Sequence, residues 1–216
     1  GAVEFFQACK KYQMIGIIGL ELDFYFEESA ERILFYAKNV AGYQELMRLS
    51  STRMMAEKPL TLTEYKINGD NLITVLPVNR LYDPSEGVLS QIAESINGEF
   101  YLGITPATKV SLLPENMPQL AIHEVVYLES TQAFAIKVMD HIQNGTQLPR
   151  EELSNQLGAN YLVGMQELID GFDNNEEALV NAQKLVEVCQ FDLPLHQKLL
   201  PHYPVPTQQA ADAYLQ

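Results

Sequence analysis

The stretch NLITVLPVNRLYDPSEGVLSQIAESINGEFYLGIT, residues 71–105, decides the fold. It opens with NLITVLPV, an apolar run that is typical of a fully buried strand. SEGVLSQIAESI then predicts a helix that Asp83 or Ser85 caps and that an Asn-Gly pair ends. EFYLGIT predicts the next strand. The stretch therefore reads as a strand–helix–strand unit, which favours two parallel strands.

Strands and helices alternate on both sides of this unit. Upstream, residues 14–22 and 32–39 predict strands, and residues 40–51 predict a helix. Downstream, QLAIHEVVYL (residues 119–128) predicts a strand, and further helices begin after Ser130 and after Asn174 or Asn175. This alternation favours parallel β/α units, either closed into a barrel or open as a doubly wound sheet. In both architectures, ligand sites lie at the carboxyl ends of the strands.

The bulk composition excludes several classes of protein. The chain has 216 residues, of which 47% are hydrophobic, so it can bury a proper core. Its net charge of −14 opposes a broad nucleic-acid surface, because such a surface needs cations to displace counterions from phosphates. No apolar run is long enough to span a membrane, and no signal peptide is visible. These features predict a cytoplasmic protein or a module that faces other proteins.

The cysteines give no sign of a metal ribbon or a redox pair. Cys9 and Cys189 lie far apart in the sequence, and neither belongs to a CxxC motif. Free cysteines of this kind are among the most buried residues in proteins, so both are expected to be buried, reduced thiols.

The run LAIHEVVYLES, residues 120–130, poses the question of a metal site. His123 and Glu124 are adjacent near the end of an expected strand, where α/β proteins place their chemistry. Adjacent side chains on a strand point to opposite faces. If Glu124 faces the site, His123 therefore faces away from it, unless the strand has already ended.

Five ordered blocks resemble a known family: GAVEFFQACKKY…IIGLEL, YAKNVAGYQELMRLSS, YLESTQAFAIKVMDHIQNG, EEALVNAQKLVEVC and LLPHYPVPTQQAADAYL. In this order they resemble the polymerase and histidinol phosphatase (PHP) domain at the amino terminus of bacterial DNA polymerase III alpha subunits. The resemblance implies a distorted (β/α)7 barrel with a C-terminal helical and linker extension. It also implies that family strands precede Gly1, about 45 residues at the length of a typical βα unit. A barrel without those strands is expected to aggregate or to melt without cooperativity.

The resemblance also divides the chain. Residues 1–145 are expected to form the PHP barrel after its first strands, and residues 146–192 the C-terminal part of the domain. Residues 193–216 contain a proline-rich stretch and are expected to form a linker towards the polymerase core, ending in the start of another helix. His196 and His202 flank those prolines and are expected to make packing contacts and backbone hydrogen bonds.

Active members of the family bind a metal cluster, and the resemblance allows each ligand position to be checked. Glu21 and Glu124 match carboxylate positions and are interpreted as remnant ligands. The other matched positions are substituted and carry Arg32, Val78, Ala107 and Val126. Valine and alanine donate nothing to a metal, and arginine brings a fixed positive charge. Glu21 is therefore expected to pair with a neighbouring arginine such as Arg32, and no metal or catalytic residue is expected in this chain.

Three functions remain open at this point. The first is a catalytically inactive structural and interaction module of a replicative DNA polymerase, whose own core would use Mg²⁺. Its expected partners are the polymerase core of the same chain and a proofreading exonuclease or other replisome subunits. The alternative is an active, metal-dependent phosphoesterase or 3′–5′ exonuclease with Glu21 and Glu124 as ligands. A third reading, an unrelated small-molecule α/β enzyme, would need a convergent pocket that no motif announces.

Overall fold

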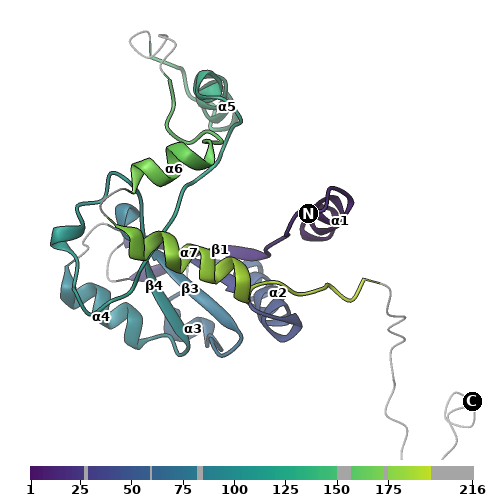
Figure 1. The fold of residues 1–216 in the computed structure, drawn as a ribbon, viewed down its shortest axis with the longest axis vertical. Coiled ribbons are helices and arrows are strands. Elements are labelled where there is room, and N and C mark those ends of the chain that lie inside the picture. Colours follow the sequence, from purple (N-terminus) through teal and green to yellow (C-terminus); the bar gives the residue numbers. More distant parts are fainter. Residues whose placement is uncertain (27–28, 59, 82–84, 150–156, 173–174, 196–216) are drawn as a thin grey trace, which may run out of the picture.

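The computed structural model describes residues 1–26, 29–58, 60–81, 85–149, 157–172 and 175–195. Within these ranges the fold is mixed α/β with one five-stranded sheet (Figure 1). The strands are β1 (Gly19–Phe26), β2 (Ser29–Ala37), β3 (Leu72–Pro77), β4 (Glu99–Ile104) and β5 (Gln119–Ala121). The helices are α1 (Ala2–Lys11), α2 (Val40–Met55), α3 (Leu62–Tyr65), α4 (Glu86–Glu94), α5 (Ala133–Gln143), α6 (Met165–Gly171) and α7 (Glu176–Val188). Short 3₁₀ turns span Val78–Arg80, Val110–Leu112 and Ser130–Gln132.

The sheet is open in the described residues and mixes two kinds of pairing. Its strand order follows the chain, β1-β2-β3-β4-β5. The predicted unit of residues 71–105 is confirmed, because β3 and β4 are parallel and α4 connects them. β5 adds a second parallel pair, but β1–β2 and β2–β3 are antiparallel. The expectation of parallel units throughout was therefore wrong at the β1 side of the sheet.

Strand β3 lies at the centre of the hydrophobic core. All six of its residues are buried, and alternate side chains enter two separate clusters. Leu72 and Leu76 join the larger cluster, which β1, β2 and β4 build with helices α2 and α4. Ile73 and Val75 join the smaller cluster, where Leu185 and Cys189 come from α7 and the residue that follows it. Helices therefore cover both faces of the sheet, but α7 packs mainly against β5 and leaves part of its face open.

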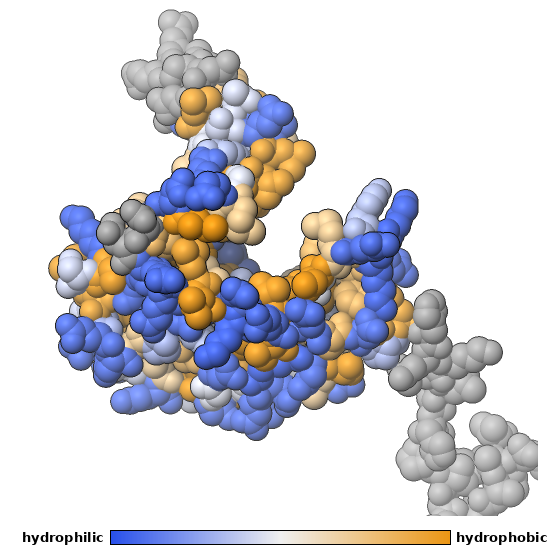
Figure 2. Space-filling view, viewed as in Figure 1, coloured by the Kyte–Doolittle hydropathy of each residue, from blue (hydrophilic) through white to orange (hydrophobic). Residues whose placement is uncertain are grey.

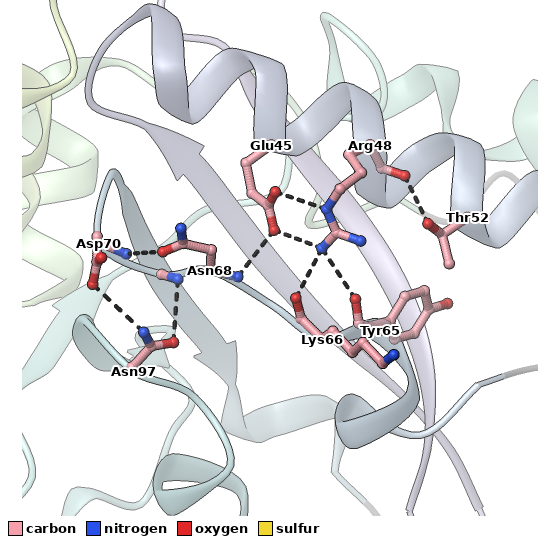
Figure 3. A network of polar contacts seen from close by, with 9 residues as sticks. Glu45, Arg48, Thr52, Tyr65, Lys66, Asn68, Asp70 and Asn97 are labelled. Carbon is pink, nitrogen blue, oxygen red and sulfur yellow. Dashed lines mark hydrogen bonds and ion pairs between the residues drawn. The ribbon is translucent and has the colours of Figure 1, made fainter.

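A polar network fixes the chain that enters β3 (Figure 3). Arg48 on α2 donates to the carboxylate of Glu45 and to the carbonyl oxygens of Tyr65 and Lys66 at the end of α3. Glu45 also accepts a bond of 2.9 Å from the backbone N–H of Asn68. This network satisfies backbone groups at the end of α3 that have no partner within that helix.

Two glycines allow the turns before β3 and β4 to touch. A Cβ on Gly69 would lie 1.6 Å from the carbonyl oxygen of Asn97. Gly98 has φ of +105°, and a Cβ there would lie 2.4 Å from the carbonyl oxygen of Gly69. Only residues without a side chain fit this contact, which sets the start of both parallel strands.

The predicted thiols are confirmed, but the predicted caps are confirmed only in part. Ser130 does not cap α5: it begins the 3₁₀ turn Ser130–Gln132, and Gln132 occupies the cap position of α5. Asn175 begins α7 by accepting a hydrogen bond from the N–H of Ala178. Ser85 occupies the cap position of α4, while Asp83 lies outside the described residues. Cys9 and Cys189 are free and buried. Burial raises the pKa of the Cys189 thiol to about 11. None of the described helices has the length and apolar content needed to cross a bilayer.

Candidate functional site

A pocket of about 710 Å³ opens beside α7 on the incompletely covered face of the sheet. Part of its lining comes from the carboxyl ends of the three parallel strands: Pro77, residues 105–107 and residues 122–124. Glu21 of β1 and Tyr36 of β2 form another part of its wall. This is the edge of the sheet at which α/β proteins bind ligands. The sequence predicted this location, and the pocket makes it the candidate site.

Glu21 and Arg32 form the ion pair that the sequence predicted. Arg32 Nη1 donates to Glu21 Oε1 at 2.7 Å. In the antiparallel register Glu21 faces Leu34, so Arg32 occupies the diagonal position two residues away on the same face. Both side chains are about half exposed, at 55% for Arg32 and 44% for Glu21. The guanidinium of Arg32 thus pairs with the carboxylate that the resemblance marked as a metal ligand.

His123 and Glu124 both line the pocket, which the sequence allowed only if the strand had ended before them. The reason is that β5 ends at Ala121, so neither residue belongs to a strand. The backbone N–H of Ile122 still bonds Ile104, but those of Val126 and Tyr127 bond the carbonyl oxygen of Asn160. The chain has therefore left β4 by this point and pairs with a distant segment.

That distant segment also engages the two site side chains. His123 Nε2 lies 2.7 Å from the carbonyl oxygen of Tyr161. Because a carbonyl oxygen only accepts, Nε2 carries the proton and donates it, which leaves no lone pair on Nε2 for a metal. Asn160 Nδ2 donates to Glu124 Oε2 at 3.0 Å. His123 and Glu124 thus hold residues 160–161 against the pocket.

The substituted positions divide between the pocket and other places. Ala107 lines the pocket and offers a methyl group. Val78 is 4% exposed and belongs to the larger core cluster. Val126 is 46% exposed and is not part of the pocket lining. None of these side chains can donate to a cation.

Sequence reasoning missed the polar groups that come from other elements. Tyr36 and Asn160 line the pocket, but they belong to β2 and to the segment after residue 157. Burial raises the pKa of the Tyr36 phenol, and the nearby Cys189 and Glu21 raise it further. The alternation of β2 could have placed Tyr36 on the face of Arg32, since the two are four residues apart. No local pattern pointed to Asn160.

The donor set does not fit a metal cluster. Among the residues that the structure describes, no three His, Cys, Asp or Glu side chains gather so that they could hold a metal ion. A zinc-type centre needs three or four such donors that converge on one point. The pocket instead contains two carboxylates that accept hydrogen bonds from neighbouring side chains, and one imidazole whose Nε2 donates to a carbonyl oxygen. The rest of its lining is largely apolar.

Comparisons with known proteins found similarity to one domain family. The family model of the PHP domain matches residues 1–107. Residues 1–107 are therefore similar to the PHP domain. The matched segment contains Glu21, Arg32, Val78 and Ala107, whereas His123, Glu124 and Val126 lie beyond it.

Curated relatives match the whole chain. The DNA polymerase III subunit alpha of Halalkalibacterium halodurans is 29% identical over 237 residues, and that of Bacillus subtilis is 27% identical over 245. Each alignment covers 100% of this chain and 21% of the relative. The subunit from Staphylococcus aureus strain COL is 24% identical and covers 100% of this chain and 19% of the relative. The chain therefore spans about a fifth of the length of these relatives.

Proposed function

We propose that this chain is the PHP module of a DNA polymerase III alpha subunit and serves DNA replication as a structural and protein-interaction domain without catalysis of its own. The observation that carries the proposal is the Glu21–Arg32 ion pair in the candidate pocket. A carboxylate already neutralised by a fixed guanidinium is a poor ligand, because the guanidinium repels an incoming cation. The apolar substitutions at Val78, Ala107 and Val126 support the same conclusion.

The proposal includes the finer architecture that the family implies. The open sheet would be part of a distorted (β/α)7 barrel, with residues 1–145 as barrel and residues 146–192 as the end of the domain. Residues 193–216 would be the linker towards the polymerase core, and residues 196–216, including His196 and His202, lie outside the described residues. The protein would be cytoplasmic. Mg²⁺ would belong to the polymerase core of the parent chain and not to this module.

The proposed partners follow from the charge and from the relatives. The net charge of −14 disfavours a broad DNA-binding surface and favours contacts with proteins. The first partner is the polymerase core of the same chain, since the relatives extend far beyond the matched region. A proofreading exonuclease or another replisome subunit would be a second partner.

The decisive experiment measures metal content and hydrolysis together in the full-length parent polypeptide. We expect no Zn or Mn to co-purify with the PHP region and no release of mononucleotides from a DNA 3′ end that depends on it. Glu21→Ala and Glu124→Gln are expected to leave DNA synthesis by the parent chain intact. Two or more tightly bound ions, with hydrolysis that Glu21→Ala abolishes, would overturn the proposal.

The second candidate is a metal-dependent phosphoesterase or 3′–5′ exonuclease. One observation favours it: Glu21, His123 and Glu124 line the same pocket, at the carboxyl ends of the parallel strands. In this function the carboxylates would hold metal ions that activate water and neutralise the phosphate. The same measurements decide between the two, because this candidate requires bound metal and the first does not.

A further inference from the structure

We propose that the groove between α6 and α7 binds an amphipathic helix whose apolar face is flanked by lysine or arginine. This inference deepens the proposed interaction role, and it concerns a groove that adjoins the candidate pocket and shares Ala182 and Val186 with it. The groove has a volume of about 740 Å³. Met165, Leu168 and Ile169 line it from α6, and Leu179, Val180 and Val186 line it from α7.

Part of the apolar lining of the groove is open to solvent, whereas Phe172 is buried and Leu168 and Leu179 are partly buried against the core. Met165 is 73% exposed, Val180 54% and Ile169 42%. In Figure 2, hydrophobic surface lies between α6 and α7, with hydrophilic surface on its borders. A contiguous apolar patch with a polar rim is the usual mark of a protein-binding surface.

The spacing of the lining residues fits a helix as the occupant. On α7 the lining positions Glu176, Leu179, Val180 and Gln183 follow the i, i+3, i+4, i+7 pattern, so one face of the helix forms one wall. On α6, Met165, Leu168 and Ile169 follow the same spacing. A groove between two such helices can bind the apolar face of a third, amphipathic helix, as in other helix-in-groove complexes.

The charge around the groove specifies the flanks of the occupant. The helices α6 and α7 carry one basic residue, Lys184. They carry five carboxylates: Glu167, Asp170, Glu176, Glu177 and Glu187. Glu176 itself lines the groove. Five negative charges against one positive charge leave these two helices at −4, so they attract a helix with basic flanks and repel an acidic one.

The test uses a synthetic peptide as the probe. It has about 15 residues, with leucine at i, i+3, i+4 and i+7 and lysine at most other positions. A peptide of identical composition in scrambled order keeps the charge but loses the apolar face, and a third peptide replaces lysine with glutamate. We expect binding by calorimetry for the first peptide only, weakened by added salt.

Protein variants locate the binding site. Ile169→Ser combined with Val180→Ser removes apolar lining and is expected to weaken binding at least about tenfold. Met54→Ser combined with Met55→Ser is the matched control, because both methionines are highly exposed on α2 and lie away from the groove. Glu176→Gln is expected to weaken binding and to reduce its salt dependence. Glu86→Gln, also in the first turn of a helix, is expected to change neither.

Each possible result has a defined meaning. Equal loss of affinity in the α2 variant and the groove variant, or no loss in either, would show that the peptide does not bind specifically in the groove and would overturn the proposal. Tight binding of the glutamate peptide, or no binding of the lysine peptide up to about 1 mM, would overturn it too. None of these results bears on metal content or hydrolysis. The proposal of a helix-binding groove can therefore be wrong while the proposed function remains correct.

Discussion

Arg32 reaches diagonally across the β1–β2 pair and places its guanidinium 2.7 Å from the carboxylate of Glu21. Both side chains are about half exposed, so the pair contributes little to folding. We expect Arg32→Gln and Glu21→Gln each to lower the free energy of unfolding by less than about 1 kcal/mol. Urea unfolding with and without a chelator measures this. A larger loss in Glu21→Gln that the chelator reproduces in the unmodified protein would reveal a metal ligand instead.

A second ion pair makes stability depend on pH. Arg53 on α2 binds both carboxylate oxygens of Asp23 on β1, at 2.9 and 3.0 Å. The hydrogen bonds from Arg53 hold the pKa of Asp23 below its ordinary value of 3.8. Because the folded pKa is lower than the unfolded one, the stabilisation is complete above the unfolded value and is lost as pH falls towards the folded value.

Unfolding experiments over the acidic range test this dependence. We expect Asp23→Asn to be less stable than the unmodified protein at neutral pH, with the difference shrinking as the solution becomes acidic. Arg53→Gln should show the same convergence, and the double variant should lose little more than either single variant. If the plots of unfolding free energy against pH stay parallel for the variants and the unmodified protein, the Asp23–Arg53 pair is not the cause of the pH dependence.

The Arg48 network anchors the end of α3 to α2 (Figure 3). Arg48→Ala leaves the carbonyl oxygens of Tyr65 and Lys66 without that donor, so we expect a loss of about 1–2 kcal/mol in unfolding free energy. Arg48→Lys keeps the charge but not the planar fork, and it should recover part of the loss. Faster hydrogen exchange at residues 65–70 in Arg48→Ala would locate the effect, and unchanged exchange there would contradict it.

Thr74 offers a stabilising substitution in β3. Its side chain is 1% exposed, and its hydroxyl has no hydrogen-bond partner among the described residues. Valine has the same shape without the hydroxyl, so Thr74→Val is expected to raise the free energy of unfolding by about 1 kcal/mol. Thr74→Ser is the matched control: it keeps the hydroxyl, loses a methyl group and should be less stable. A destabilised Thr74→Val would indicate that the hydroxyl has a partner.

Residues 71–105 were predictable because the signals in them are local. A buried apolar run, a capped helix and a second apolar run define β3, α4 and β4. The antiparallel β1–β2 pair had a signal in the sequence that was overlooked: the predicted strands at residues 14–22 and 32–39 leave only nine residues between them, whereas a parallel crossover needs a dozen or more. The pairing of Glu21 with Arg32 was also predictable, since it needs only a fixed charge near a carboxylate.

The shape of the site around His123 was not predictable from local sequence. QLAIHEVVYL has the apolar character of a strand, but β5 keeps only its first three residues. Glu124, Val126 and Tyr127 bond to Asn160, which lies 33 to 36 positions further along the chain. Contacts of this range depend on how the whole chain packs, and a window of ten residues holds no information about them.

The burial of both native cysteines has a practical consequence for labelling. With the pKa of Cys189 raised to about 11, almost none of it is thiolate at neutral pH, and Cys9 is only 8% exposed. A maleimide dye would therefore react first with a cysteine introduced on the surface, for example by Gln183→Cys beside the α6–α7 groove. Single-site fluorescence work can proceed on this protein without first replacing its own sulfhydryl groups.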